Sequence, residues 1–136
     1  MDEATLELHV DAVDIDGFTI LEDVFDADRA AAICDRVRQI EADTLRPLEA
    51  GEDETDSSFY RTGGLLRLDP MFWDVPIDPT VCQVVEGVLG EDFLLSTFSG
   101  IDLKPQGPTV QPLHPDDALV PVPRPHERAI GCTVMW

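Results

Sequence analysis

The spacing of apolar residues changes at Gly90, and this change constrains the fold more than any other feature of the sequence. Before Gly90 the apolar residues recur mainly at intervals of three and four, as they do in amphipathic helices. After Gly90, short runs of β-branched and aromatic residues alternate with Gly and Pro, as they do in strands joined by turns. Helices followed by strands predict an α+β fold in which helices pack on the outside of a β-sandwich.

Two helices are predicted before this boundary. Asp26 is a suitable N-cap for the first, which is expected to run to about Asp43. Its apolar stripe consists of Ala30, Ile33, Val37 and Ile40. The second begins at Asp78-Pro79, a cap and a first-turn proline, and Gly90 ends it. Its inward face is expected to carry Val81, Val84, Val85, Val88 and Leu89.

The segments around these helices are less regular. Residues 5–16 fit either a short helix or a strand. Residues 17–21 and 60–68 are predicted to form strands, the second around Gly63-Gly64, whereas residues 70–79 are expected to be irregular. A polar, acidic stretch at about residues 44–60 predicts an exposed, mobile loop within a single domain that spans 1–136.

The strand-like runs after Gly90 are too few for a closed β-sandwich. They cover residues 93–98, 101–104, 109–113 and 130–136. Strands of about five residues give roughly four here, against about eight in a jelly roll. The chain also ends within an apolar run. We therefore expect a C-terminally truncated domain with an incomplete double-stranded β-helix (jelly roll).

The chain is strongly acidic, with 28 Asp and Glu against 9 Lys and Arg, a net charge of −19. This charge repels nucleic acids and anionic membranes, so neither is an expected partner. Lys104 is the single lysine, and an acidic surface with Arg in place of Lys is expected of a halophilic protein. The codon bias of a GC-rich genome explains the composition equally well.

The apolar runs and the cysteines bear on where the protein resides. No apolar run approaches the roughly 20 residues of a membrane helix, so a soluble, cytoplasmic protein is predicted. Cys34, Cys82 and Cys132 are widely spaced among apolar neighbours. They are expected to be core residues in a reducing compartment, without a disulfide framework or a zinc site.

Residues 111–117, Gln-Pro-Leu-His-Pro-Asp-Asp, form the motif with the clearest chemical meaning. His114 and Asp116 are two residues apart, so in an extended strand their side chains point to the same face and can converge on one metal ion. A second histidine from a distant strand would complete the facial 2-His-1-carboxylate triad of non-haem iron enzymes. Taken alone, the motif is a weak signal, because His-x-Asp occurs by chance in many chains and Asp116 or Asp117 could simply cap a turn.

The order of these features resembles the phytanoyl-CoA dioxygenase family over nearly the whole chain. The shared features are the segment Asp16-Gly-Phe-Thr-Ile-Leu21, an Ala-rich amphipathic helix, an apolar helix closing with Leu89-Gly90, Lys104-Pro105 and the His-x-Asp motif. The resemblance implies an iron(II)- and 2-oxoglutarate-dependent dioxygenase that uses dioxygen to hydroxylate a small organic substrate. It assigns His114 and Asp116 as the metal ligands.

The resemblance also implies residues that bind 2-oxoglutarate. Lys104 would contact the co-substrate, Gln111 would line its pocket and Trp136 would lie beside it, although core packing explains Trp136 equally well. The distal histidine and the 2-oxoglutarate-binding arginine of the family would lie downstream of Trp136, so this chain alone is expected to be inactive. His126, in a proline-rich loop, and His9 are expected to be surface residues.

Three other interpretations stay open. The chain could be an inactive remnant of the fold that binds metal weakly. An acidic binding module or nucleic-acid mimic would cluster its carboxylates on one face, whereas a halophilic enzyme would spread them evenly. A cupin-like metalloenzyme would normally show more histidines around the motif. The substrate is not specified by any of these patterns.

Overall fold

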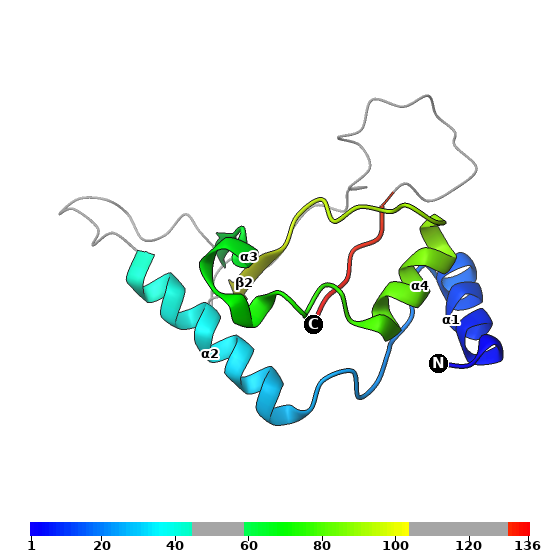
Figure 1. Ribbon diagram of the computed structural model, residues 1–136, viewed down its shortest axis with the longest axis horizontal. Helices are drawn as coiled ribbons and strands as arrows, with labels where there is room; N and C mark the ends of the chain where they lie inside the picture. The colour runs from blue at the N-terminus through cyan, green and yellow to red at the C-terminus, as the bar shows by residue number, and fades with distance from the viewer. Residues whose placement is uncertain (45–58, 104–130) are drawn as a thin grey trace, which may run out of the picture. The chain divides into compact units, whose positions relative to one another are not determined.

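The computed structural model describes residues 1–44, 59–103 and 131–136, which are drawn in colour in Figure 1. They belong to two compact units. Unit 1 comprises Met1–Val24, Ile77–Leu94 and the described residues 131–136. Unit 2 comprises residues 25–44, 59–76 and 95–103 of the described chain. Each unit has its own packed elements.

Unit 1 is built from two capped helices. Helix α1 (Glu3–Asp16) begins at Asp2, whose carboxylate accepts a hydrogen bond from the Thr5 N–H at 2.8 Å. Helix α4 (Pro79–Leu89) begins at Asp78, whose carboxylate accepts from the Thr80 N–H at 2.9 Å. The open prediction for residues 5–16 is thus resolved as a helix, and the predicted cap, start and end of the second helix are confirmed.

The two helices of unit 1 pack closely at a glycine. A Cβ atom at Gly87 would lie 2.5 Å from Val10 Cγ2, so only glycine allows this approach of α4 to α1. Three α4 side chains on the predicted inward face are buried, namely Val81, Val84 and Val85. The remaining two predicted positions, Val88 and Leu89, are half-buried.

Unit 2 packs one long helix against an antiparallel pair of strands that lie far apart in the sequence. Helix α2 (Ala27–Thr44) begins after Asp26, whose carboxylate accepts from the Arg29 N–H at 2.7 Å, as predicted. Strands β1 (Phe59–Gly63) and β2 (Ser99–Leu103) pair antiparallel, with Thr62 opposite Gly100. Between them lie the short helices α3 (Leu65–Leu68) and η2 (Pro70–Phe72).

The core of unit 2 forms where these elements meet. Its buried centre is Ile40, Leu65 and Phe72. Phe98 packs against this centre, and its ring meets that of Phe72 edge-on with centroids 6.5 Å apart. The Phe98 carbonyl accepts from the backbone N–H groups of Gly64 and Leu65, which ties the turn after β1 to the start of β2.

Several strand predictions are wrong. Residues 17–21 and 93–98 lie in no strand. Gly17 adopts φ 84° and ends α1, and the chain then folds back so that Thr19 contacts α1 without pairing to another strand. The strand predicted at 60–68 stops at Gly63, because Gly64 at φ 69° turns the backbone into α3. A run of β-forming residues becomes a strand only where a partner backbone is available.

The remaining strand predictions have mixed outcomes. The run predicted at 101–104 corresponds to β2, which begins two residues earlier. Residues 131–136 form no strand, and residues 109–113 lie outside the described part of the chain. Residues 45–58 of the predicted acidic loop also lie outside it.

The mixture of helices with a small antiparallel sheet confirms the α+β class. The sheet has two strands within the described residues, so the jelly roll stays a prediction. The helices of the described part of the chain include none that is long and apolar enough to cross a membrane.

Candidate functional site

Strand β2 leads directly to the predicted site. Its last residue, Leu103, pairs with Phe59 of β1, and Lys104 is the next residue along the chain. Lys104 and the motif residues Gln111, His114 and Asp116 lie outside the described residues. Their roles stay predictions, and the structure describes the elements that hold the strand before them.

Strand β2 is fixed to α2 by a second close backbone approach. A Cβ atom at Gly100 would lie 2.6 Å from Val37 Cγ1, so a side chain at this position would push the strand away from α2. Gly100 also pairs with Thr62 in the sheet. The strand that precedes Lys104 is therefore held on one side by β1 and on one face by α2.

A buried carboxylate reinforces this arrangement. Glu41 of α2 is only 6% exposed, and its Oε1 accepts a hydrogen bond from the Thr62 hydroxyl at 3.0 Å. This bond joins α2 to β1 at Thr62, the residue that pairs with Gly100 of β2. Sequence reasoning missed Glu41. The available signal was its position four residues after Val37, which places an acid on the apolar face of the helix.

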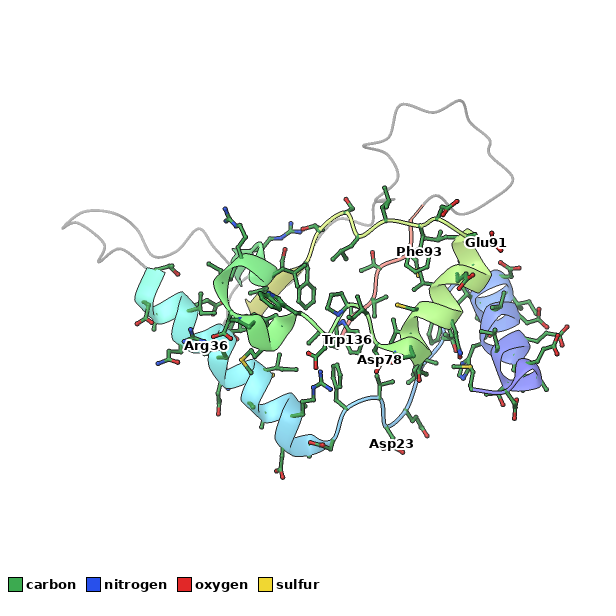
Figure 2. The ribbon with its side chains drawn as sticks, viewed as in Figure 1. Asp23, Arg36, Asp78, Glu91, Phe93 and Trp136 are labelled. Atoms are coloured by element: carbon green, nitrogen blue, oxygen red, sulfur yellow. The ribbon has the colours of Figure 1, made fainter. Side chains whose placement is uncertain are left out.

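Two ion pairs connect α2 to the segment around η2. Arg36, which is labelled in Figure 2, donates to Asp69 at 2.7 Å. Arg29 lies 2.8 Å from Asp74. The Asp69 carboxylate also accepts from the Met71 N–H at 2.9 Å. The Met71 N–H, followed by the Arg36 guanidinium, lowers the pKa of Asp69. These contacts attach residues 69–74 to α2.

Trp136 is the one predicted co-substrate residue that the structure describes. It belongs to unit 1, in residues 131–136, and is 49% exposed (Figure 2). A large aromatic side chain with this exposure is available to form part of a pocket wall, and its assignment to the co-substrate stays a prediction.

The cysteines differ from their predicted place in the core. Cys34 and Cys132 are exposed and Cys82 is half-buried, and none of these three described residues forms a disulfide. Cys34 follows Ile33 on α2, and one helical position rotates it away from the apolar stripe. Surrounding atoms partly desolvate Cys132 and raise the pKa of its thiol.

Of the two histidines outside the motif, the structure describes His9. His9, which we expect at the surface, is instead half-buried, and its Nδ1 lies 2.8 Å from the Thr19 hydroxyl oxygen. The contact arises because the chain folds back after Gly17. His126 lies outside the described residues.

No metal-binding cluster of three or more His, Cys, Asp or Glu side chains occurs in residues 1–44, 59–103 and 131–136. The candidate metal ligands stay the predicted His114 and Asp116, which lie outside these ranges. An imidazole and a carboxylate are both suitable donors for iron(II), which favours mixed nitrogen and oxygen ligation.

Comparison with known families identifies the chain's relatives. The sequence model of the phytanoyl-CoA dioxygenase (PhyH) family matches residues 13–136. The match includes α2, both strands, α4 and the His-x-Asp motif, and it begins within α1. No solved structure matches the chain.

Proposed function

Because this chain belongs to the phytanoyl-CoA dioxygenase family, we propose that it serves iron(II)- and 2-oxoglutarate-dependent hydroxylation of a small organic substrate. Dioxygenase chemistry in general is the activity expected of the family. The observation that carries the proposal is the family match over residues 13–136, a range that includes His114 and Asp116.

The proposed metal ligands are the His114 imidazole and the Asp116 carboxylate. When bound, iron(II) would supply the activation of dioxygen at the expense of 2-oxoglutarate. Asp116 offsets part of the charge of the ion, and His114 binds through a neutral ring nitrogen. A histidine ligand binds metal only as the neutral imidazole, so protons compete with iron(II) for it as the pH falls.

Lys104 is proposed to bind 2-oxoglutarate. The co-substrate is a dianion, and a chain of net charge −19 repels it in solution. A lysine next to β2 supplies a local positive charge that pairs with one of its carboxylates. Gln111 would add an amide hydrogen bond, and Trp136 an apolar wall that excludes water.

Anaerobic calorimetric titration with iron(II) tests the proposed ligands. The chain offers weak sites to any divalent cation through its many carboxylates, so the buffer should contain high salt and excess Mg²⁺. His114→Ala and Asp116→Ala should each weaken iron binding by at least about tenfold. The matched controls His126→Ala and Asp117→Asn should leave it within about threefold of the unaltered chain.

Two results would contradict the ligand assignment. One is equal loss of iron binding in His114→Ala and His126→Ala, which would mean that the ion is bound without selectivity. The other is unchanged binding in both ligand variants, which would place the metal elsewhere. Both results can be read with no knowledge of the substrate.

A further inference from the structure

Charge is divided unequally between the two units. The described residues of unit 1 contain no Lys or Arg. Their acidic residues are Asp2, Glu3, Glu7, Asp11, Asp14, Asp16, Glu22, Asp23, Asp78, Glu86, Glu91 and Asp92. The described residues of unit 2, in contrast, include Arg29, Arg36, Arg38, Arg61 and Arg67. Adaptation to salt alone would spread the acidic excess over both units.

Helix α1 carries an acidic ridge beside an exposed apolar stripe. The ridge is defined by Glu3, Glu7, Asp11 and Asp14, which follow at spacings of four, four and three and so lie in one row along the helix. Figure 2 shows oxygen-tipped side chains along the side of α1 that faces away from α4. The stripe is defined by Leu8 and Ile15, which are 71% and 80% exposed.

The stripe is not the face that packs on α4. Leu6 and Val10 lie against Gly87 of α4. At about 100° per residue, Ile15 lies half a turn around the helix from Leu6, and Leu8 lies within about 20° of Ile15. The outer face of α1 therefore presents two large aliphatic side chains to solvent, next to the acidic ridge.

The ridge is unfavourable for α1 itself. Like charges at spacings of three and four repel each other, and α1 has no Lys or Arg to offset them. Asp14 and Asp16 lie in the last turn, where negative charge also opposes the helix dipole. Residues 1–12, which hold three of the four ridge residues, precede the range that the family model matches.

We propose that the outer face of α1 binds a basic amphipathic helix of another protein. Lysine or arginine side chains of the partner would neutralise the ridge, and its apolar side chains would cover Leu8 and Ile15. A second copy of this chain would bring the same ridge into contact with itself and would be repelled. Anionic membranes and nucleic acids would be repelled for the same reason.

Binding of designed peptides to the full 136-residue chain tests this proposal. The probe is a peptide of about 18 residues, with leucine on one face and lysine on the other, long enough to form a helix. Isothermal calorimetry at near-physiological salt should detect binding of this peptide and none of its leucine–glutamate counterpart. Absence of binding by the lysine peptide, or equal binding by the glutamate peptide, would overturn the proposal.

Matched variants locate the surface. Leu8→Gln with Ile15→Gln should weaken binding by about tenfold or more, and Glu7→Gln with Asp11→Asn should also weaken it. The controls are Leu94→Gln, an 89% exposed leucine outside α1, and the pair Asp43→Asn and Glu86→Gln. If the control variants weaken peptide binding as much as the α1 variants do, binding depends only on the overall charge or hydrophobicity of the chain, and the proposed surface is wrong.

Amide chemical shifts of the unaltered chain provide a readout that no variant can confound. On addition of the lysine peptide, the largest shifts should fall on α1. Larger shifts on α2 than on α1 would contradict the proposed surface. The His114→Ala variant should bind the peptide as the unaltered chain does, because this surface is independent of the proposed iron site.

Discussion

Asp69 illustrates how single residues hold unit 2 together. Its carboxylate receives the Met71 N–H and the Arg36 guanidinium, so it caps η2 and joins it to α2. These contacts lower the pKa of Asp69. Its stabilising effect is thus fully present above the ordinary carboxyl pKa of about 4 and is lost as the pH falls through the lowered value.

Asp69→Asn should remove this acid-sensitive stabilisation. Asparagine keeps an oxygen that can accept from Met71 but loses the charge that pairs with Arg36. We expect a lower unfolding midpoint than that of the unaltered chain at pH 7, and a smaller difference at about pH 3, by thermal circular dichroism. The control Asp35→Asn, in an exposed pair with Arg38 at 3.8 Å, should change little. A difference that grows as the pH falls would contradict this account.

The bond between Thr62 and Glu41 should contribute more than a surface contact. Thr62→Val removes the hydroxyl while keeping the shape, and leaves a buried carboxylate without its donor. We expect the free energy of unfolding in urea to fall by about 1–3 kcal/mol. Adding Glu41→Met should recover part of the loss, because both polar partners are then absent. The control Thr97→Val, at an exposed position, should have little effect.

Residues that hydrogen-bond to others nearby in the sequence could be predicted from the sequence. Asp26, Asp78 and Gly90 cap helices through bonds within four residues, so local spacing identified them. Glu41 bonds to a residue 21 positions away, and Asp69 to one 33 positions away. Helical spacing places Glu41 on the apolar face of α2, but the partner of each acid depends on the tertiary fold.

At the scale of elements, the helices were predicted more accurately than the strands. A helix satisfies its own backbone hydrogen bonds, so the apolar spacing of α2 and α4 sufficed. Strands need a partner, and the β-forming runs at 17–21 and 93–98 have none in the described chain. The His-x-Asp motif, like the helices, is a local pattern. Its two residues, His114 and Asp116, are close in sequence and could be recognised without knowledge of the fold.

The packing of α1 on α4 makes Gly87 a sensitive position. Gly87→Ala would place a methyl group 2.5 Å from Val10 Cγ2, so we expect a loss of about 1–3 kcal/mol in the free energy of unfolding. Val10→Ala, combined with it, should restore part of this loss. Gly63→Ala, with no atom within 4 Å of the added carbon, is the matched control. If α1 did not pack here, Gly87→Ala would instead stabilise by up to about 1 kcal/mol through helix propensity.

At the scale of the whole molecule, composition shows that the chain is acidic but not where the charge gathers. The net charge of −19 does not reveal how charge is distributed. In the described chain, all arginines lie in unit 2. The family could be recognised from the order of features, and its match confirms that recognition. The jelly roll could not be assessed from local patterns, because strand order depends on contacts between distant segments.

The charge of the whole chain should make its stability depend on salt. Raising KCl from about 0.1 M to about 2 M screens carboxylate repulsion and should raise the unfolding temperature by at least about 4 °C. A chain with Glu3, Glu7, Asp11 and Asp14 replaced by their amides should respond less. An uncharged osmolyte at equal osmolality separates screening from general solvent effects. An equal response to salt and to the osmolyte would refute the electrostatic explanation.

The central claim is that this chain contributes an iron and 2-oxoglutarate site through its His-x-Asp motif. The most direct measurement is anaerobic addition of 2-oxoglutarate to the iron(II)-loaded chain in high salt, recorded by visible absorption. We predict a metal-to-ligand charge-transfer band that His114→Ala abolishes and His126→Ala preserves, with Lys104→Met raising the 2-oxoglutarate concentration it requires. A band that persists in His114→Ala, or no band from the folded, iron-loaded chain, would contradict the claim.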